Sequence, residues 1–253
     1  FDQEYVHAIG YRTKAAVEEA PKAVLLVDLG GHAEADLERG VARIQAIVAD
    51  HPSTRMTLAR DHDEARAFWS DRKQLGAIAR RTNAFKLNED VVIPLSALAD
   101  FAAFIEAQNA AAEREAQRAF AHEAESLLAP TLPELAKACA TFAHALATAT
   151  PEDLRSLRVL KAWSAQLETA LADAPELLER LREMEIQARD RRLVLATHMH
   201  AGDGNVHVNL PVHSSDPDML ARAHRAVDRV MAQVVALGGV VSGEHGIGVT
   251  KLK

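Results

Sequence analysis

The stretch "HMHAGDGNVHVN", residues 198–209, places three histidines and two asparagines around a Gly-Asp-Gly sequence. Imidazole nitrogens can bind a metal ion and amide groups can hydrogen-bond a polar ligand, so the spacing of these residues decides what they could do together. The dipeptide Asp203-Gly204 is typical of a two-residue hairpin loop, because both central positions of a type I′ turn need positive φ. The sequence therefore predicts a β-hairpin with its loop at Asp203 and Gly204.

This loop position determines which side chains share a face of the hairpin. It pairs His200 with His207 and His198 with Asn209, and all four polar groups then lie on one face, which we expect to be solvent-exposed. Facing Cβ atoms are roughly 4.5–5.5 Å apart, a separation from which two imidazoles can bind one cation. The alternative is that the histidines line a solvated hairpin and bond to water or carboxylates. The opposite face is apolar and suited to pack against a core, with Leu195, Met199, Val206, Val208, Leu210 and Val212.

Composition limits the class of protein. The chain has 253 residues, 48% hydrophobic and 26% charged, as is usual for a folded cytosolic protein. A net charge of −7, without a dense Lys/Arg stripe, argues against nucleic acid as the main partner. The single cysteine, Cys139, excludes an internal disulfide and a Cys-rich cluster. No apolar run has the length of a membrane span, so we expect a cytoplasmic protein, or one peripheral at the inner face of the membrane in a full-length parent.

Hydrophobic patterns indicate the elements that position the hairpin. Short apolar segments predict strands at 23–31, 55–61 and 84–94. Helical spacing predicts helices at 33–50 and 63–82. This alternation predicts an α+β fold with a largely antiparallel sheet covered by helices.

The segment 107–190 has a different texture, rich in Ala, Glu, Leu and Arg. We predict an inserted all-helical subdomain of three or four helices there, placed between α+β parts at 1–106 and 191–253. A further helix is expected over about 216–237. The prolines that mark helix starts in the insertion are Pro130, Pro133, Pro151 and Pro175.

A second glycine-rich stretch, "ALGGVVSGEHGIG" at 236–248, follows the last predicted helix. Its glycines free the backbone for close approach around Glu244 and His245. The chain has neither a G-x-G-x-x-G after a strand nor a P-loop lysine motif, and thus no visible cradle for nucleotide phosphates.

"HAGDGNVHVN" followed by "SGEHGIG" resembles the C-terminal domain of FAD-linked oxidases, the family of D-lactate dehydrogenases, D-2-hydroxyglutarate dehydrogenase and the glycolate oxidase FAD subunit. "FWSDRK" and "FKLNEDVVIPLSAL" resemble two further patterns of that family, and together the likeness covers 22–105 and 192–253. It implies a duplicated ferredoxin-like α+β domain that caps the flavin, while an N-terminal domain, absent from this chain, binds FAD. Since the chain opens without Met at "FDQEYVHAIG" and stops at "GVTKLK", we expect a fragment of a longer parent.

The resemblance also implies a site. His200 and His207 match the family's metal-binding histidines and Glu244 its carboxylate ligand, a set suited to Zn²⁺, with Mn²⁺ or Fe²⁺ as alternatives. His245 matches the general base, which takes the substrate's hydroxyl proton and lies at the flavin. Asn209, on the same face as the two ligand histidines, would bond the substrate or the flavin edge.

Two cationic residues match the groups that hold the substrate carboxylate in that family: Arg72 and, less clearly, Lys86. Each assignment has a structural alternative. Arg72 could form a surface ion pair beside Asp71, and Glu244 and the histidine after it could serve as a helix-cap neighbour and a buried hydrogen-bonded side chain. His198 is an alternative third metal ligand in place of Glu244.

The function implied is the cap and substrate domain of an FAD-dependent 2-hydroxy acid dehydrogenase, an oxidoreductase that passes hydride from substrate C2 to the flavin. Its expected partners are a small 2-hydroxy acid, the FAD-binding domain of the same parent and an iron–sulfur electron-transfer domain or subunit. We expect the isolated chain to be inactive and not to retain FAD. One alternative is a non-enzymatic metal-binding or docking module that contacts an electron-transfer partner through the helical insertion. Another is a stand-alone metallohydrolase.

Overall fold

The computed structural model describes residues 1–8, 21–73 and 85–243, although the side chains at 6–8, 71–73 and 85–86 are not part of that description. The chain divides into two compact units. Unit 1 comprises Phe1–Asn83 with Ala196–His198, and unit 2 comprises Ala84–Leu195 with Met199–Lys253.

Asp2 organises the start of unit 1. Its carboxylate accepts a hydrogen bond of 2.8 Å from the backbone N–H of Tyr5 at the start of helix α1 (Gln3–Ala8). The same carboxylate accepts two hydrogen bonds of 2.7 Å from the backbone N–H and the hydroxyl of Thr197. Asp2 is largely buried, and this desolvation raises the pKa of its carboxyl above the ordinary value while the bonds to Thr197 oppose that rise.

Two helices of unit 1 agree with the predicted helical spacing. Helix α2 (Glu34–Ala49) fills almost all of the segment predicted at 33–50. Helix α3 (His62–Lys73) fills the first half of the segment predicted at 63–82, and the rest of that segment lies outside the described residues.

The strands predicted at 23–31 and 55–61 are wrong. The described backbone of these segments forms one isolated bridge, between Asp2 and Ala23. Leu25 is 72% exposed and Leu58 is 51% exposed. A strand must pair its backbone groups with a neighbour, and a short apolar run does not reveal whether one is available.

A three-stranded antiparallel sheet carries the predicted hairpin. Strand β1 (Phe85–Val92) confirms the strand predicted at 84–94. Strands β2 (Ala196–His200) and β3 (Asn205–Val212) follow the helical segment in sequence, and the sheet order is β1-β3-β2. An α+β fold with an antiparallel sheet is therefore confirmed.

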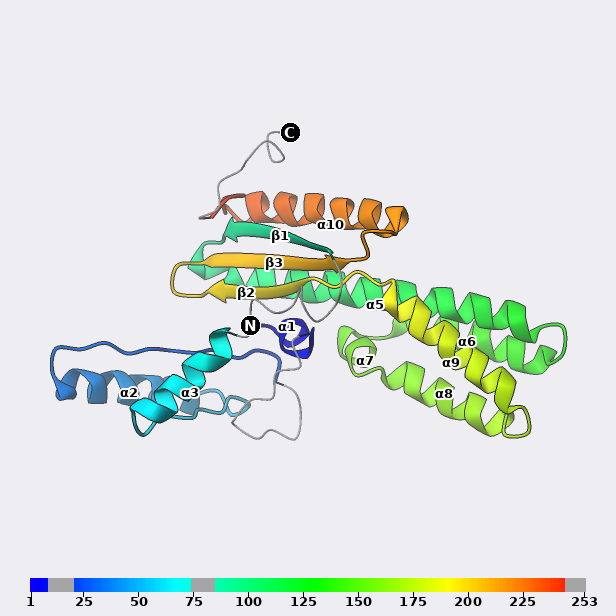
Figure 1. Ribbon diagram of the computed structural model, residues 1–253, viewed down its shortest axis with the longest axis horizontal. Coiled ribbons are helices and arrows are strands. Elements are labelled where there is room, and N and C mark those ends of the chain that lie inside the picture. The colour runs from blue at the N-terminus through cyan, green and yellow to red at the C-terminus, as the bar shows by residue number, and fades with distance from the viewer. Residues whose placement is uncertain (9–20, 74–84, 244–253) are drawn as a thin grey trace. The chain divides into compact units, whose positions relative to one another are not determined.

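The apolar face of this sheet forms one of the two cores of unit 2 together with two helices. Helix α10 (Pro217–Ala236), which confirms the helix expected at about 216–237, runs alongside the sheet (Figure 1). The side chain of Asp216 caps it by accepting a hydrogen bond of 2.9 Å from the backbone N–H of Met219. The start of helix α5 (Leu98–Leu128) packs on the same core through Phe101 and Ile105. The residues predicted for this face that are fully or nearly fully buried are Leu195, Val206, Val208, Leu210 and Val212.

The predicted helical segment 107–190 is helical and has a core of its own. At its centre the rings of Phe142 and Trp163 stack with centroids 4.3 Å apart. Three of the four prolines stand at helix starts as predicted, whereas Pro130 lies in the turn before the next helix. After α5, the helices are α6 (Pro133–Thr148), α7 (Pro151–Arg155), α8 (Arg158–Ala170) and α9 (Pro175–Asp190).

Helix α5 belongs to both cores of unit 2. Its first turns pack on the sheet, whereas Phe120 and Leu128 near its other end lie in the core of the helical bundle (Figure 1). The boundary expected between 106 and 107 thus falls inside one uninterrupted helix of 31 residues. Neither α5 nor any other helix in the described part of the chain has the length and apolar character needed to cross a bilayer.

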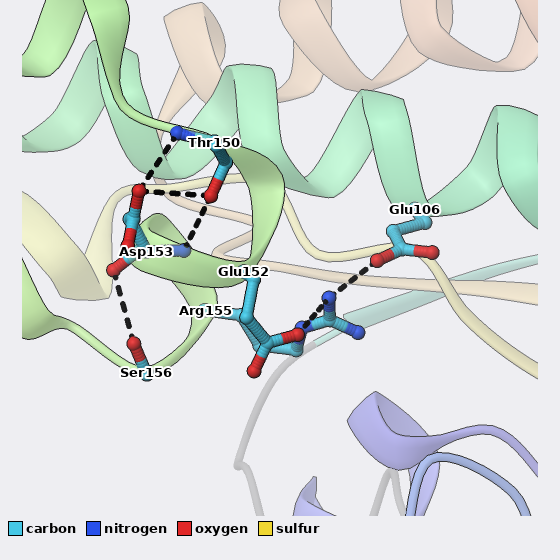
Figure 2. Close-up of polar contacts among 6 residues, drawn as sticks. All are labelled: Glu106, Thr150, Glu152, Asp153, Arg155 and Ser156. Atoms are coloured by element: carbon cyan, nitrogen blue, oxygen red, sulfur yellow. Dashed lines mark hydrogen bonds and ion pairs between the residues drawn. The ribbon is translucent and has the colours of Figure 1, made fainter.

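The short helix α7 is fixed to α5 by polar contacts, drawn in Figure 2. Thr150 caps it, because its hydroxyl accepts a 3.1 Å hydrogen bond from the backbone N–H of Asp153 while its own N–H donates to that carboxylate at 3.2 Å. Arg155 forms ion pairs with Glu152 at 2.8 Å and with Glu106 on α5.

A buried charge joins α5 to the end of α9. Glu113 is 3% exposed and forms ion pairs with Arg192 and, at 3.6 Å, with Arg189. Gln117 donates a hydrogen bond of 2.8 Å to the same carboxylate. This cluster holds the chain where it leaves the helical bundle and returns to β2.

Candidate functional site

The hairpin loop differs from the one predicted. Strand β2 ends at His200 and β3 begins at Asn205, so four residues connect them. The backbone N–H of Asp203 donates to the carbonyl of His200 at 3.0 Å, and Gly204 follows with a φ of 70°. Among the described non-glycine residues Leu157 has a positive φ and Asp203 does not, so the predicted type I′ loop is wrong. Four-residue hairpin loops are built around a type I turn, and a glycine in the left-handed region returns the chain to the strand.

Gly204 also ties the loop to the end of β1. Its carbonyl accepts a hydrogen bond of 2.8 Å from the backbone N–H of Ile93. A Cβ placed on Gly204 would lie 2.1 Å from the carbonyl oxygen of Ile93. Both the backbone conformation and the close contact therefore require glycine at this position.

The structure brings His200 and His207 together on one face of the hairpin. Their ring centroids lie 6.2 Å apart with the planes at 74°. Two imidazoles that bind one Zn²⁺ at about 2.1 Å and a tetrahedral angle have centroids roughly 5 Å apart, so the two rings are farther apart here than in such a pair. His200 is exposed, whereas His207 is 5% exposed.

Asp90 is a member of this site that the sequence reasoning missed. It lies directly opposite His207 in the β1–β3 pairing, and its Oδ1 is 3.8 Å from Nδ1 of that histidine. The side chain is 2% exposed. The alternation of Lys86, Asn88 and Asp90 along β1 was the available signal, because alternate residues of a strand share a face.

The polar face of the hairpin is only partly solvent-exposed, which corrects the expectation for it, because His200 is exposed whereas His207 and Asn209 are buried. Asp90, His207 and Asn209 are all buried. Residues 240–243 run antiparallel beside β1 and form a bridge with it. The backbone N–H of Gly243 donates to the carbonyl of Asp90 at 3.1 Å, and a Cβ on Gly243 would lie 2.2 Å from Oδ1 of Asp90. The absence of a side chain at Gly243 is what lets this segment approach.

Asn205 adds an acceptor to the same region. Its Oδ1 is buried and accepts no hydrogen bond within the described part of the chain. That oxygen lies 2.7 Å from the position of a Cβ on Gly243. A buried amide oxygen without a donor is costly, so this end of the polar face is suited to take a donor from a ligand or from another part of the protein.

Two other predicted residues of the hairpin have defined surroundings. Asn209 is fully buried, and its Nδ2 donates a weak hydrogen bond of 3.4 Å to the carbonyl of His207. The ring of His198 packs on the ring of Tyr5 with centroids 5.0 Å apart, within unit 1. Burial raises the pKa of Tyr5 to about 12, so this partner of His198 keeps its proton at physiological pH.

The remaining predicted residues are described only in part. Arg72 belongs to α3 and Lys86 to β1, where it pairs with Pro211, but their side chains lie outside the description. Glu244 and His245 lie outside the described residues altogether.

The described residues do not by themselves complete a metal site. Within residues 1–8, 21–73 and 85–243, no three His, Cys, Asp or Glu side chains gather closely enough to hold an ion. His200 and His207 offer imidazole nitrogens, which suit Zn²⁺, and the third ligand predicted for them is Glu244. The donor chemistry fits a divalent metal, and the metal stays a prediction.

Comparison with known proteins identifies a family whose match includes the hairpin residues. The family model described as FAD linked oxidases, C-terminal domain, matches residues 2–148 and 105–253. The glycolate oxidase subunit GlcD of Bacillus subtilis (strain 168) is 30% identical over 109 residues, which are 43% of this chain and 23% of that protein. The D-lactate dehydrogenase of Archaeoglobus fulgidus is 40% identical over 65 residues, 26% of this chain and 14% of that protein.

These alignments span less than a quarter of the relatives' own length. The GlcD subunit of Escherichia coli (strain K12) is 40% identical over 60 residues, which are 24% of this chain and 12% of that protein. No solved structure matches the chain. The family match covers both ends of the chain, including the segment that carries His200 and His207. The chain therefore belongs to the family of the FAD linked oxidases, C-terminal domain.

Proposed function

We propose that this chain is the substrate-side domain of an FAD-dependent 2-hydroxy acid dehydrogenase. The observation that carries the proposal is the meeting of His200 and His207 on one face of the hairpin, with Asp90 behind His207. Family membership supports it, as do relatives named for glycolate and D-lactate, which are both 2-hydroxy acids.

In this proposal the chain binds the acid and removes a proton from it. His200, His207 and Glu244 would hold a divalent metal, best suited to be Zn²⁺, and such an ion would lower the pKa of the substrate hydroxyl. Arg72 and Lys86 bind the substrate carboxylate by charge-assisted hydrogen bonds. With the carboxylate held by Arg72 and Lys86 and the hydroxyl directed toward the histidines, substrate C2 would be held in one orientation.

The chemical step separates a proton from a hydride. His245 takes the hydroxyl proton as the C2–H bond breaks and C2 becomes a carbonyl carbon. FAD, held by another domain of the parent, supplies the acceptor for the hydride. The substrate would become a 2-oxo acid, with its hydroxyl proton on His245 and the hydride passed to the acceptor. Asn209 lies two residues after His207 in β3, and we assign it to the substrate or the flavin edge.

The direct test uses the full-length parent loaded with FAD and Zn²⁺, with glycolate and D-lactate as substrates and dye reduction as the readout. The His245→Ala variant should lose roughly 10²–10⁴-fold in rate. The matched control is His224→Ala, an exposed histidine on α10, which should keep the wild-type rate. A parent that oxidises no 2-hydroxy acid, or a His245→Ala variant as fast as the control, would contradict the proposal.

A second test needs no flavin. Elemental analysis of the purified chain should find close to one divalent metal per chain, and the His200→Ala/His207→Ala double variant should lose it. The double variant His144→Ala/His224→Ala removes two exposed histidines and should keep the metal. Equal metal content in both double variants would exclude the hairpin as the binding site.

We expect the parent to act in the cytoplasm or at the inner face of the membrane and to pass electrons to an iron–sulfur domain or subunit. We also expect the isolated chain to be inactive and to purify without FAD. Among the described residues of 107–190, Ile186 is the single large hydrophobic side chain that is strongly exposed. One such side chain does not form an apolar patch that would favour the alternative docking function.

A further inference from the structure

A cavity of about 190 Å³ that is open to solvent lies between α5 and α10, outside the site described above, and Arg225 and Arg229 at its edge are exposed. Three arginines of α10 line one wall: Arg222, Arg225 and Arg229. All of its lining residues belong to unit 2, so its shape does not depend on how the two units are arranged.

The spacing of the arginines follows from the way α10 packs. Residues at i, i+3 and i+7 lie along the same side of a helix, and Arg222, Arg225 and Arg229 have that spacing. The neighbouring stripe of α10, which includes Ala226 and Val230, is buried against the sheet. The arginines therefore stand at the edge of the buried stripe, facing the groove next to α5.

Small side chains leave the space open. Ala111 and Ala112 of α5 and Ala226 of α10 line the cavity where longer side chains would fill it. Leu193 and Leu195, both buried, line it as well. The cavity thus combines an apolar floor with a cationic wall.

The arginines are incompletely neutralised. Arg222 donates a hydrogen bond of 2.6 Å to the backbone carbonyl of Arg191 and lies 3.9 Å from Glu115, the one carboxylate in the lining. Arg229 uses its Nε to bond the neutral side chain of Gln108 at 2.8 Å. Arg225 makes no hydrogen bond or ion pair in the described part of the chain.

The net charge of the cavity lining is opposite in sign to the net charge of the whole chain. Three guanidinium groups and one carboxylate give the lining a net charge of +2, whereas the whole chain carries −7. Positive charge concentrated in a concavity attracts a small anion of matching charge. Guanidinium groups are weakly hydrated and bind oxyanions with two parallel hydrogen bonds, which suits phosphate in particular.

We propose that this cavity binds a small dianion of the phosphate class, either inorganic phosphate or the phosphate group of a small ester. Its volume is below the roughly 300–1,000 Å³ of pockets that take drug-sized ligands, which limits the ligand to a few non-hydrogen atoms. The three arginines bind the phosphate oxygens, and the alanine floor accepts a short organic arm. This site is independent of the proposed dehydrogenase function, because none of its residues is assigned to the metal, the substrate or the flavin.

The test is a calorimetric titration of the 253-residue chain with inorganic phosphate, at low and at moderate salt concentration. The variant Arg225→Ala/Arg229→Ala should weaken phosphate binding at least tenfold. The matched control is Arg43→Ala/Arg180→Ala, two exposed arginines elsewhere, which changes the net charge equally and should leave the affinity unchanged. Circular dichroism and a melting curve establish that each variant is folded before it is titrated.

Three outcomes would overturn the site: no saturable phosphate binding by the wild type, equal losses in both double variants, or equal affinity for phosphate and acetate. The source of the phosphate is resolved by comparing inorganic phosphate with glycerol 3-phosphate. Tighter binding of the ester, with the same dependence on Arg225 and Arg229, assigns the site to a phosphate ester. Tighter binding of the inorganic ion assigns it to free phosphate.

Discussion

Nδ1 of His207 lies 3.8 Å from Oδ1 of Asp90, its direct neighbour across the β1–β3 pair, and both side chains are buried. The distance is longer than a hydrogen bond, but the carboxylate lies on the side of the ring from which an outer carboxylate commonly orients a metal-binding histidine. The two strands that supply this pair are separated in the sequence by the whole helical segment. The geometry of the hairpin face therefore depends on a strand that the motif itself does not include.

Replacing Asp90 with asparagine should lower the affinity of the chain for Zn²⁺ by about 10–100-fold, because the neutral amide removes the negative charge beside His207. The measurement is competition for Zn²⁺ with a chromophoric chelator. Long-range ¹⁵N spectra of the imidazole should also show a changed tautomer ratio at His207 without any metal. Asp173→Asn, at an exposed loop position, is the control and should change neither result. An Asp90→Asn variant with unchanged affinity and tautomer would show that Asp90 only fills space.

Gly204→Ala should destabilise the protein by at least about 1–2 kcal/mol. The left-handed backbone conformation is unfavourable for alanine, and its Cβ would clash with the carbonyl oxygen of Ile93. Urea unfolding monitored by circular dichroism measures this change. Gly202→Ala is the matched control in the same loop, because a Cβ there would have no atom within 4 Å and its φ is not positive. Equal stability of the two variants would contradict the assigned backbone conformation.

Glu113→Ala should cost about 1–3 kcal/mol of unfolding free energy, because it leaves Arg189 and Arg192 without their buried partner. The cost stays below that of a fully buried pair, since both arginines are partly exposed and water can solvate them. Urea unfolding again provides the measurement, with the exposed Glu123→Ala on the same helix as the control. If both variants unfold at the same urea concentration, the cluster does not fasten α9 to α5.

Cys139 should react slowly with thiol reagents at pH 8 in the native chain and rapidly in the unfolded chain. Burial, with a smaller effect of Glu125, raises the pKa of its thiol to about 11, so little thiolate is present. A folded pKa above the unfolded value means that this group favours folding below about pH 9 and loses that contribution as the pH rises toward 11.

The pH effect is measured as the difference in unfolding free energy between the wild type and Cys139→Ala at pH 8 and pH 10.5. The wild type should lose stability relative to the variant at the higher pH. A constant difference would mean that the thiol titrates alike in both states.

Sequence patterns predicted the hairpin well where the signal was local. Asp203-Gly204 marked a turn, and the alternation through Val206 and Val208 identified the buried face. The loop length was wrong, because the same dipeptide also fits a four-residue loop around a type I turn. Prolines predicted three helix starts because their fixed φ suits the first helical position.

Features that depend on distant pairing were not predictable. The position of Asp90 opposite His207 is set by the register between two strands more than a hundred residues apart, which no local pattern encodes. The burial of Asp90 depends on the contact of residues 240–243 with β1. Gly243 indicates that the backbone there approaches another segment closely, but the sequence does not show which segment this is. The segment 23–31 failed as a strand for the same reason, since its apolar side chains do not say whether a neighbouring strand exists.

The length of helix α5 constrains how this protein can change. This single helix contributes residues to the core at the sheet and to the core of the bundle. The rotation of the helix about its axis therefore sets which residues face each core. Inserting one residue near its middle would rotate one end by about 100° relative to the other and turn a buried stripe toward water. Only insertions or deletions close to a whole number of turns, about three or four residues or about seven, preserve both interfaces. Insertions or deletions in α5 can therefore change the distance between the bundle and the sheet only by about one or two helical turns.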